Sequence, residues 1–268
     1  MSTLRAKTLA RLREQIRTLE KPGLSGRSVL EFGDPAIDDD LPGGGLASGC
    51  LHELAARPQD AAAYGLLAVL LGRLIGEAGA APGMALWCAL KHSGRPAMPY
   101  GPGLMRFGLA TERLILARAG KPADLLWAME EGLRSGRFAA VLGEGLAPDL
   151  TATRRLQLAA EAGGATALLA FPASDSRSLR LSAATTRWRI AALPAVRPDR
   201  PRWQVSLERC RGGGRRVPPS RPQVFDAPAG ASRRRSACPS GRSGDSPWML
   251  LPAVPLRDAR ADARAASI

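Results

Sequence analysis

Short apolar runs alternate with longer amphipathic segments along the middle of this chain, and this alternation restricts the possible folds more than any other feature. The runs are short enough for buried strands, and the longer segments have the apolar spacing of helices. The expected strands are residues 50–54, 84–90, 114–117, 138–143 and 165–171. The expected helices are residues 61–78, 102–107, 122–134 and 151–162. Repeated strand–helix units predict an α/β fold in which a mostly parallel central sheet carries helices on both faces.

Two later segments have a different rhythm. Residues 187–193 and 202–208 alternate apolar and polar side chains with a period of two. In the second segment this places Trp203, Val205 and Leu207 on one buried face. Such alternation is typical of strands with one face in the core, so these segments are predicted to be edge strands that form an antiparallel pair.

Composition divides the chain into four regions. These are residues 1–21, an amphipathic helix; 22–49, a connector rich in Gly, Pro and Asp; 50–210, the α/β core; and 211–268, a basic tail. Because Pro, Gly, Ser and Arg dominate the tail, it is predicted to be disordered. Its one apolar cluster, Trp248–Leu251, is either a short docking motif or a chance feature.

The N-terminal helix carries one apolar stripe. Leu9, Leu12, Ile16 and Leu19 recur at spacings of three, four and three, and Pro22 follows the helix. Such a stripe is buried against another surface. It packs either on its own domain or on a partner protein, and it is the predicted partner-binding surface of the chain. A helix of this length does not support a free two-helix dimer by itself.

Positive charge is concentrated at the two ends of a chain whose net charge is +14. Residues 1–27 carry seven basic and two acidic residues, and residues 201–268 carry thirteen basic and five acidic residues. Basic ends attract nucleic acid through counterion release, whereas a solvated tail is the simpler interpretation. The candidate nucleic-acid or partner contacts in the tail are Arg211, Arg215, Arg216, Arg233, Arg234 and Arg235.

The segment between the first expected strand and helix lies where a phosphate-binding loop would be found. Such a loop needs glycines whose N–H groups surround the phosphates, a lysine, and a Ser or Thr for Mg²⁺. Residues 55–63 contain no glycine, lysine or hydroxyl. Asp60 would repel a triphosphate, and Pro58 removes one backbone donor. The sequence therefore predicts no nucleotide cofactor.

Other catalytic constellations are incomplete. Glu144, after the strand at 138–143, is the only candidate Mg²⁺ ligand, and it is interpreted as a helix-cap or surface residue. No carboxylate near Cys88 and His92 supports a nucleophilic dyad. His52 lies within a strand and is interpreted as a core or inter-strand residue. We expect no enzymatic activity.

Metal, disulfide and membrane chemistry are also not indicated. Three adjacent carboxylates at Asp38–Asp40 cannot all converge on one ion, so they are expected to cap or solvate a loop. The four cysteines are widely spaced without a Cys-x-x-Cys pair, which is typical of a protein in the reducing cytoplasm. No uncharged apolar run reaches the roughly 18 residues of a membrane span. We expect a cytoplasmic protein.

A family resemblance emerges from several segments together. Residues 41–54, L-P-G-G-G-L-A-S-G-C-L-H-E-L, are similar to the lead-in to the nucleotide loop of RecA-type recombinases. With residues 86–88, 125–131 and 151–161, they resemble the ImuA family of bacterial inducible-mutagenesis proteins, which are RecA-like but lack a working ATP site. The resemblance covers residues 1–212. The tail departs from the family pattern, in which a further apolar strand follows Arg-Gly-Gly.

The resemblance implies a RecA-like fold and a non-catalytic accessory role in damage-induced (SOS) translesion DNA synthesis. The implied partners are an ImuB-like polymerase homologue, an error-prone replicative-type polymerase and RecA. The basic tail would bind a partner or DNA. The leading helix would then bind a RecA-like surface on a partner, or cap a RecA filament. Two alternatives remain: an SOS cell-division inhibitor of the same RecA-like group, and a divergent DNA-dependent ATPase that uses Arg57 in place of the loop lysine.

Overall fold

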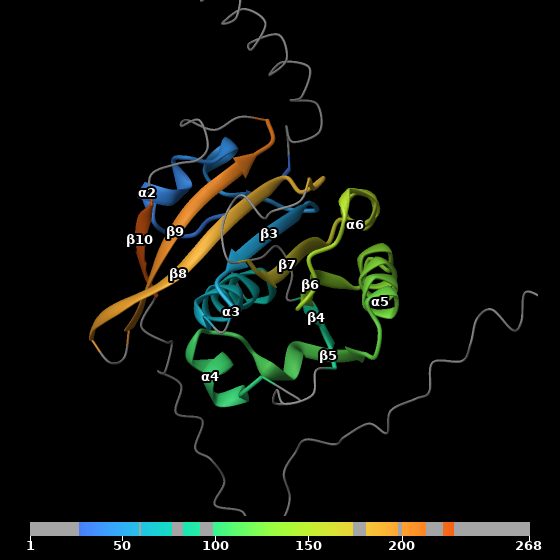
Figure 1. Cartoon of the computed structure of the whole chain (residues 1–268), viewed down its shortest axis with the longest axis horizontal. Coiled ribbons are helices and arrows are strands. Elements are labelled where there is room, and N and C mark those ends of the chain that lie inside the picture. Colours follow the sequence, from blue (N-terminus) through green and yellow to red (C-terminus); the bar gives the residue numbers. More distant parts are fainter. Residues whose placement is uncertain are drawn as a thin grey trace, which may run out of the picture. The chain divides into compact units, whose positions relative to one another are not determined.

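An eight-stranded mixed sheet organises the folded part of the chain (Figure 1). The computed structural model describes residues 27–58, 60–76, 83–91, 99–173, 181–197, 200–212 and 222–227. The chain divides into two units, residues 1–232 and 233–268, and every described residue belongs to the first. The predicted N-terminal helix and most of the predicted tail lie outside the described residues.

The sheet is mostly parallel. In spatial order its strands are β10 (Gln223–Asp226), β9 (Arg200–Cys210), β8 (Thr186–Arg197), β3 (Leu51–Ala56), β7 (Thr166–Pro172), β6 (Phe138–Glu144), β4 (Met84–Leu90) and β5 (Leu114–Ala119). The six strands from β8 to β5 run parallel to one another, whereas β9 and β10 are antiparallel to their neighbours. The predicted α/β class and parallel sheet are confirmed.

Helices cover both faces of the parallel strands. Helix α3 (Ala62–Ile75) packs on one face, and α5 (Pro122–Arg134) and α6 (Leu150–Gly163) pack on the other. Successive residues of β3 point to opposite faces, so Leu54 joins the core cluster of α3 and Leu51 joins that of α5 and α6. None of the helices in the described ranges is long and apolar enough to span a membrane.

The α3 face carries the aromatic part of the core. The ring of Phe32 lies 5.0 Å from that of Trp188, and Trp203 stacks on Phe225 at 6.0 Å between centroids. All four side chains are at least 96% buried. Since full burial of one large apolar side chain contributes about 1.5–3 kcal/mol, this cluster is a main source of stability for the β8–β9–β10 region.

The predicted connector is instead part of the folded core from residue 27 onward. Strand β1 (Val29–Leu30) pairs with β2 (Leu46–Ala47), and the short helices α2 (Pro35–Asp38) and η2 (Pro42–Gly44) lie between them. Four of its apolar side chains are buried in the α3-face core: Phe32, Ile37, Leu41 and Leu46. Composition did not indicate these contacts, because glycines and prolines together outnumber the apolar residues in the predicted connector, residues 22–49.

Asp38 has the loop-capping role expected for the Asp38–Asp40 run. Its carboxylate accepts hydrogen bonds from the backbone nitrogens of Phe32 (2.7 Å), Gly33 (2.8 Å) and Asp34 (3.2 Å). These three bonds hold the turn that leads into α2.

Two predictions about the last strands are wrong in detail. Strands β8 and β9 do form an antiparallel pair, but neither is an edge strand, because β8 also pairs in parallel with β3 and β9 also pairs with β10. Strand β10 lies within the tail predicted to be disordered, and its Phe225 is buried against Trp203. Trp203, Val205 and Leu207 face the core as predicted.

Candidate functional site

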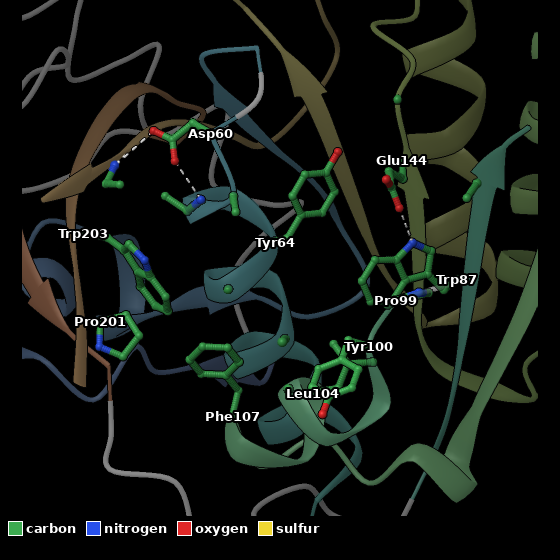
Figure 2. Close-up of a pocket in the computed structure, with 18 of the residues that line it drawn as sticks. Asp60, Tyr64, Trp87, Pro99, Tyr100, Leu104, Phe107, Glu144, Pro201 and Trp203 are labelled. Carbon is green, nitrogen blue, oxygen red and sulfur yellow. Dashed lines mark hydrogen bonds between the residues drawn. The ribbon is translucent and has the colours of Figure 1, made fainter. Parts of the chain in front are cut away.

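A cavity of about 740 Å³ lies at the carboxyl ends of β4 and β6 (Figure 2). Ligands of open α/β sheets bind at this edge of the sheet. The walls come from the first turns of α3, the ends of β4 and β6, the short helix α4 (Gly101–Arg106) and the β8–β9 pair. The fold therefore assembles the cavity from segments more than 100 residues apart in the sequence.

Aromatic rings form much of the wall. Tyr64, Trp87, Tyr100, Phe107 and Trp203 all line the cavity, and the rings of Phe107 and Trp203 are 5.7 Å apart. Trp203 is fixed from behind by Phe225 and is only 4% exposed, whereas Tyr100 is 76% exposed. The wall thus combines a nearly buried indole, Trp203, with an exposed tyrosine, Tyr100.

The position of Trp203 in this wall depends on a glycine in α3. A Cβ atom on Gly65 would lie 2.4 Å from Cζ2 of Trp203, closer than real Cβ contacts allow. The glycine lets the indole ring lie directly against the helix backbone, which sets the depth of the cavity at this point.

Glu144 is neither the helix cap nor the plain surface residue that the sequence suggested. Its Oε2 accepts a 2.8 Å hydrogen bond from Nε1 of Trp87, and the residue lines the cavity. Helix α6 is capped by Asp149, whose Oδ1 accepts from the nitrogen of Ala152 at 2.8 Å. The sequence did not reveal this role of Glu144, because Trp87 belongs to β4, which pairs with β6 only in the folded sheet.

The loop between β3 and α3 is held by its own carboxylate. Asp60 Oδ1 accepts from the nitrogen of Ala62 (2.8 Å), and Oδ2 accepts from the nitrogen of Ala192 on β8 (3.0 Å). In a nucleotide-binding loop, N–H groups at this helix end point to phosphate. Here a side-chain anion uses the first of them and ties the loop to a neighbouring strand, while Arg57 is exposed on the loop.

Among the described lining residues, the charged side chains are Asp60, Glu144 and Arg118, set around an aromatic wall. Among the described residues, no three His, Cys, Asp or Glu side chains come together in a way that could hold a metal ion.

Comparisons with known proteins give the family. No protein-family model matches the chain. The ImuA proteins of two Caulobacter vibrioides strains, NA1000 / CB15N and ATCC 19089 / CIP 103742 / CB 15, are each 38% identical over 199 residues, which is 69% of this chain and 80% of the relative. The chain belongs to the ImuA family. The resemblance found in the sequence is confirmed.

This ImuA-family chain also shares similarity with SulA proteins. The cell division inhibitor SulA of Edwardsiella piscicida is 34% identical over 109 residues, 40% of this chain and 61% of that protein. The crystal structure of SulA from Pseudomonas aeruginosa matches with 30% identity and a TM-score of 0.37, covering 46% of this chain and 98% of that one. This score is too low to support a structural argument.

Most of the predicted partner and nucleic-acid contacts of this ImuA-family chain cannot be located. Leu9, Leu12, Ile16 and Leu19 lie outside the described residues, and so do Arg215, Arg216, Arg233, Arg234 and Arg235. Arg211 is described and exposed, and its Nη1 donates to the carbonyl oxygen of Ala183 at 3.0 Å. Its guanidinium thus helps to fasten the segment that leads into β8.

His52 is a fully buried inter-strand residue, as predicted. Its Nε2 lies 2.9 Å from the carbonyl oxygen of Ala47, which can only accept, so Nε2 carries the proton. Its Nδ1 therefore accepts from Oγ1 of Thr186 at 2.8 Å, and that oxygen accepts from Nε1 of Trp188. Burial lowers the pKa of His52 to about 4, so the ring is neutral near pH 7.

A buried ion pair lies beside His52 on the other face of β3. Glu53, 1% exposed, accepts from Nε of Arg187 at 2.6 Å and from Oγ of Ser182 at 2.5 Å. Arg209 donates to the carbonyl oxygen of Ser182, and burial is the main cause that lowers the pKa of this arginine. The sequence signal for this pair is an acidic residue next to a histidine inside a largely apolar strand.

Cys88 is not suited to act as the nucleophile of a Cys88–His92 dyad. Cys88 is 1% exposed, and burial raises the pKa of its thiol to about 12, so the sulfur remains protonated. His92 lies outside the described residues.

Proposed function

We propose that the protein is a non-catalytic, RecA-like accessory factor in damage-induced (SOS) translesion DNA synthesis. In this role it acts as an adaptor for an ImuB-like polymerase homologue, and its other partners are RecA or an error-prone replicative-type polymerase. The observation that carries the proposal is membership of the ImuA family, with 38% identity over 80% of the relative.

The sheet topology supports a RecA-like origin. The parallel strands are ordered β8–β3–β7–β6–β4–β5, and β3, the first of them in the sequence, lies in the interior of the sheet. A loop and the buried helix α3 follow β3, which is the position of the nucleotide loop in such proteins.

The residues of the loop between β3 and α3 support a protein that is not regulated by nucleotide binding. Asp60 already accepts the N–H of Ala62 and places a negative charge at the start of α3. A triphosphate would be repelled there, and a lysine that could neutralise it is missing from residues 55–63. The alternative of a divergent ATPase built on Arg57 would require Asp60 to release both of its backbone donors.

A genetic experiment tests this function. Deleting the gene in its own bacterium should lower ultraviolet-induced mutation to rifampicin resistance at least fivefold, without changing survival in undamaged cultures. The full-length gene should restore induced mutation, and a gene lacking residues 1–21 should not, at equal protein level. Unchanged induced mutation in the deletion strain would refute the proposal.

The similarity to SulA supports a second candidate function, inhibition of cell division during the SOS response. Overproduction would then produce dose-dependent filaments, even in cells without DNA damage. The adaptor proposal predicts cells of normal length at the same protein level, so microscopy of induced cultures separates the two functions.

A further inference from the structure

One ridge on the surface of α6 consists mainly of exposed apolar side chains. Leu150, Arg154, Leu158 and Ala162 follow one another at intervals of four residues, so they lie along one side of the helix, and we call them the α6 ridge. All four residues are exposed, Leu150 to 49% and Leu158 to 47%. Among the described residues with large exposed apolar side chains, these two leucines are the pair that shares one helix. A single exposed leucine is ordinary, whereas an aligned ridge is a surface on which another helix can pack.

Residues 1–21 carry a feature that complements the α6 ridge. Their predicted helix has an apolar stripe made of Leu9, Leu12, Ile16 and Leu19. A helix of this length is only marginally stable by itself in water, so it needs a surface on which to bury the stripe. At 1.5 Å per helical residue the stripe extends over about 15 Å and the α6 ridge over about 18 Å. The two surfaces therefore match in length.

The chain enters the described structure beside the carboxyl end of α6. Nη1 of Arg27, the first described residue, donates to the carbonyl oxygen of Gly49 at 2.6 Å. A Cβ atom on Gly49 would lie 3.0 Å from that nitrogen and 3.5 Å from Cα of Gly164, the C-cap residue of α6. Residues 22–26 can span up to about 17 Å, and Leu158 lies about 9 Å along the helix axis from Gly164. The predicted N-terminal helix can therefore reach the α6 ridge of its own chain.

We propose that residues 1–21 pack their apolar stripe on the α6 ridge of their own chain, with the two helices parallel. The short connection sets this direction, because it keeps Leu19 near Ala162 and so places Leu9 toward Leu150. The inference concerns the free protein and does not depend on the proposed adaptor function. Since the same stripe is the predicted partner-binding surface, a partner that binds it has to displace it from α6.

Hydrogen exchange of the full-length protein, followed by mass spectrometry, tests the proposal. The backbone amides of residues 9–20 should exchange at least tenfold more slowly than those of a synthetic peptide of residues 1–21. Leu158→Glu should remove this protection, because it places a charge on the α6 ridge while glutamate keeps a high helix propensity. Exchange in the parent protein as fast as in the peptide, or equal protection in the parent and in Leu158→Glu, would overturn the proposal.

Two further variants separate docking on α6 from a general effect of added charge. Met105→Glu places the same charge at a residue that is 50% exposed on α4, and it should leave the protection unchanged. Ile16→Glu changes the stripe itself and should remove the protection as fully as Leu158→Glu does. Combining Ile16→Glu with Leu158→Glu should cause no further loss, because each change alone already undocks the helix. Equal loss of protection in Met105→Glu and Leu158→Glu would contradict the assignment to α6.

The same experiment reports whether each variant is folded. The amides of β3 should exchange equally slowly in the parent and in all variants. If Leu158→Glu also raises exchange in β3, Leu150→Glu takes its place, since it changes the first residue of α6 and should also remove the protection of residues 9–20.

Protein concentration distinguishes the ridge of the same chain from that of a second copy. Protection by packing within one chain does not depend on concentration, so a hundredfold dilution should leave the exchange rates of residues 9–20 unchanged. Protection that is lost on dilution would mean that the helix packs on α6 of another copy, and it would overturn the proposal.

Discussion

The two ends of the β3–β8 strand pair have opposite characters. At the amino end, buried polar side chains pair with one another: His52 with Thr186, and Glu53 with Arg187 and Ser182. At the carboxyl end, beyond Ala56, the chain forms an aromatic cavity that includes the exposed ring of Tyr100. The amino end thus contains buried charged side chains, whereas the carboxyl end has an apolar surface that is open to solvent.

This contrast shows why a cluster of buried ionisable groups is a poor guide to function by itself. Each polar group in the first region has a partner within the chain, so the cluster stabilises and orients the strands. The cavity also contains charged groups, but its described lining residues leave a space of about 740 Å³ between them. We therefore expect the functional site at the carboxyl end of the strand pair. Substitutions at the amino end are expected to lower the stability of the fold.

The largest expected effect comes from breaking the buried ion pair. Arg187→Leu removes the guanidinium from the buried Glu53 carboxylate, which keeps its hydrogen bond from Ser182, and removal of one partner of such a pair costs about 3–5 kcal/mol. Urea unfolding should show this loss of unfolding free energy. Combining Arg187→Leu with Glu53→Leu should recover part of it, because no uncompensated charge then remains. A loss below about 1 kcal/mol in the single variant would mean that the pair is not structurally important.

A second test uses the pH dependence of stability. The pKa of His52 is lowered to about 4 in the folded protein from 6.5, so the unfolded chain binds the extra proton first as pH falls. The contribution of His52 to the free energy of unfolding is complete above pH 6.5 and is lost progressively as the pH falls toward 4. At about 1.4 kcal/mol per pH unit, the total loss is about 3 kcal/mol. His52→Gln should lose less stability than the parent chain between these pH values. Parallel curves of unfolding free energy against pH would contradict the buried neutral histidine.

A smaller effect is expected at the base of the cavity. Gly65→Ala places a methyl group 2.4 Å from the Trp203 ring, and such overpacking costs about 1–3 kcal/mol. The higher helix propensity of alanine returns up to about 1 kcal/mol, so the net loss should be about 1–2 kcal/mol. Gly120→Ala is the control, since a Cβ atom there meets no heavy atom within 4 Å. Equal stability of the two variants would show that Trp203 moves freely.

The smallest effect concerns the loop before α3. Asp60→Ala removes the acceptor for the Ala62 and Ala192 nitrogens and should cost about 1 kcal/mol, the usual cost of losing a helix-terminal acceptor. Asp149→Ala, which removes the cap of α6, should cost a similar amount. We also expect Asp60→Ala not to create ATP binding, because the loop still has no lysine. A nucleotide shift in the thermal unfolding of Asp60→Ala would mean that this carboxylate alone excludes ATP.

The sequence was informative wherever one local pattern determines the structure. The strand–helix alternation predicted the parallel strands and helices, because burial on both faces produces short apolar runs. It also identified the core face of β9 through Trp203, Val205 and Leu207. It could not show that β8 is an interior strand, since a period of two is compatible with either position in a sheet.

The cavity could not be predicted, because no local pattern encodes it. Tyr64, Tyr100 and Trp203 lie on separate elements, and only the strand order brings them together. Strand β10 was missed for a related reason: Phe225 is the one aromatic residue in a Pro- and Arg-rich stretch, and its partner Trp203 is on another strand. Glu144 was interpreted as a helix-cap or surface residue, because its hydrogen-bond partner Trp87 lies on another strand.

The most direct measurement for the central claim is the affinity of the purified full-length protein for the ImuB-like polymerase homologue of the same bacterium, with and without Mg·ATP. The account predicts binding with the same Kd in both conditions. Absence of binding, or a Kd that changes tenfold or more with ATP, would contradict the account of a nucleotide-independent adaptor.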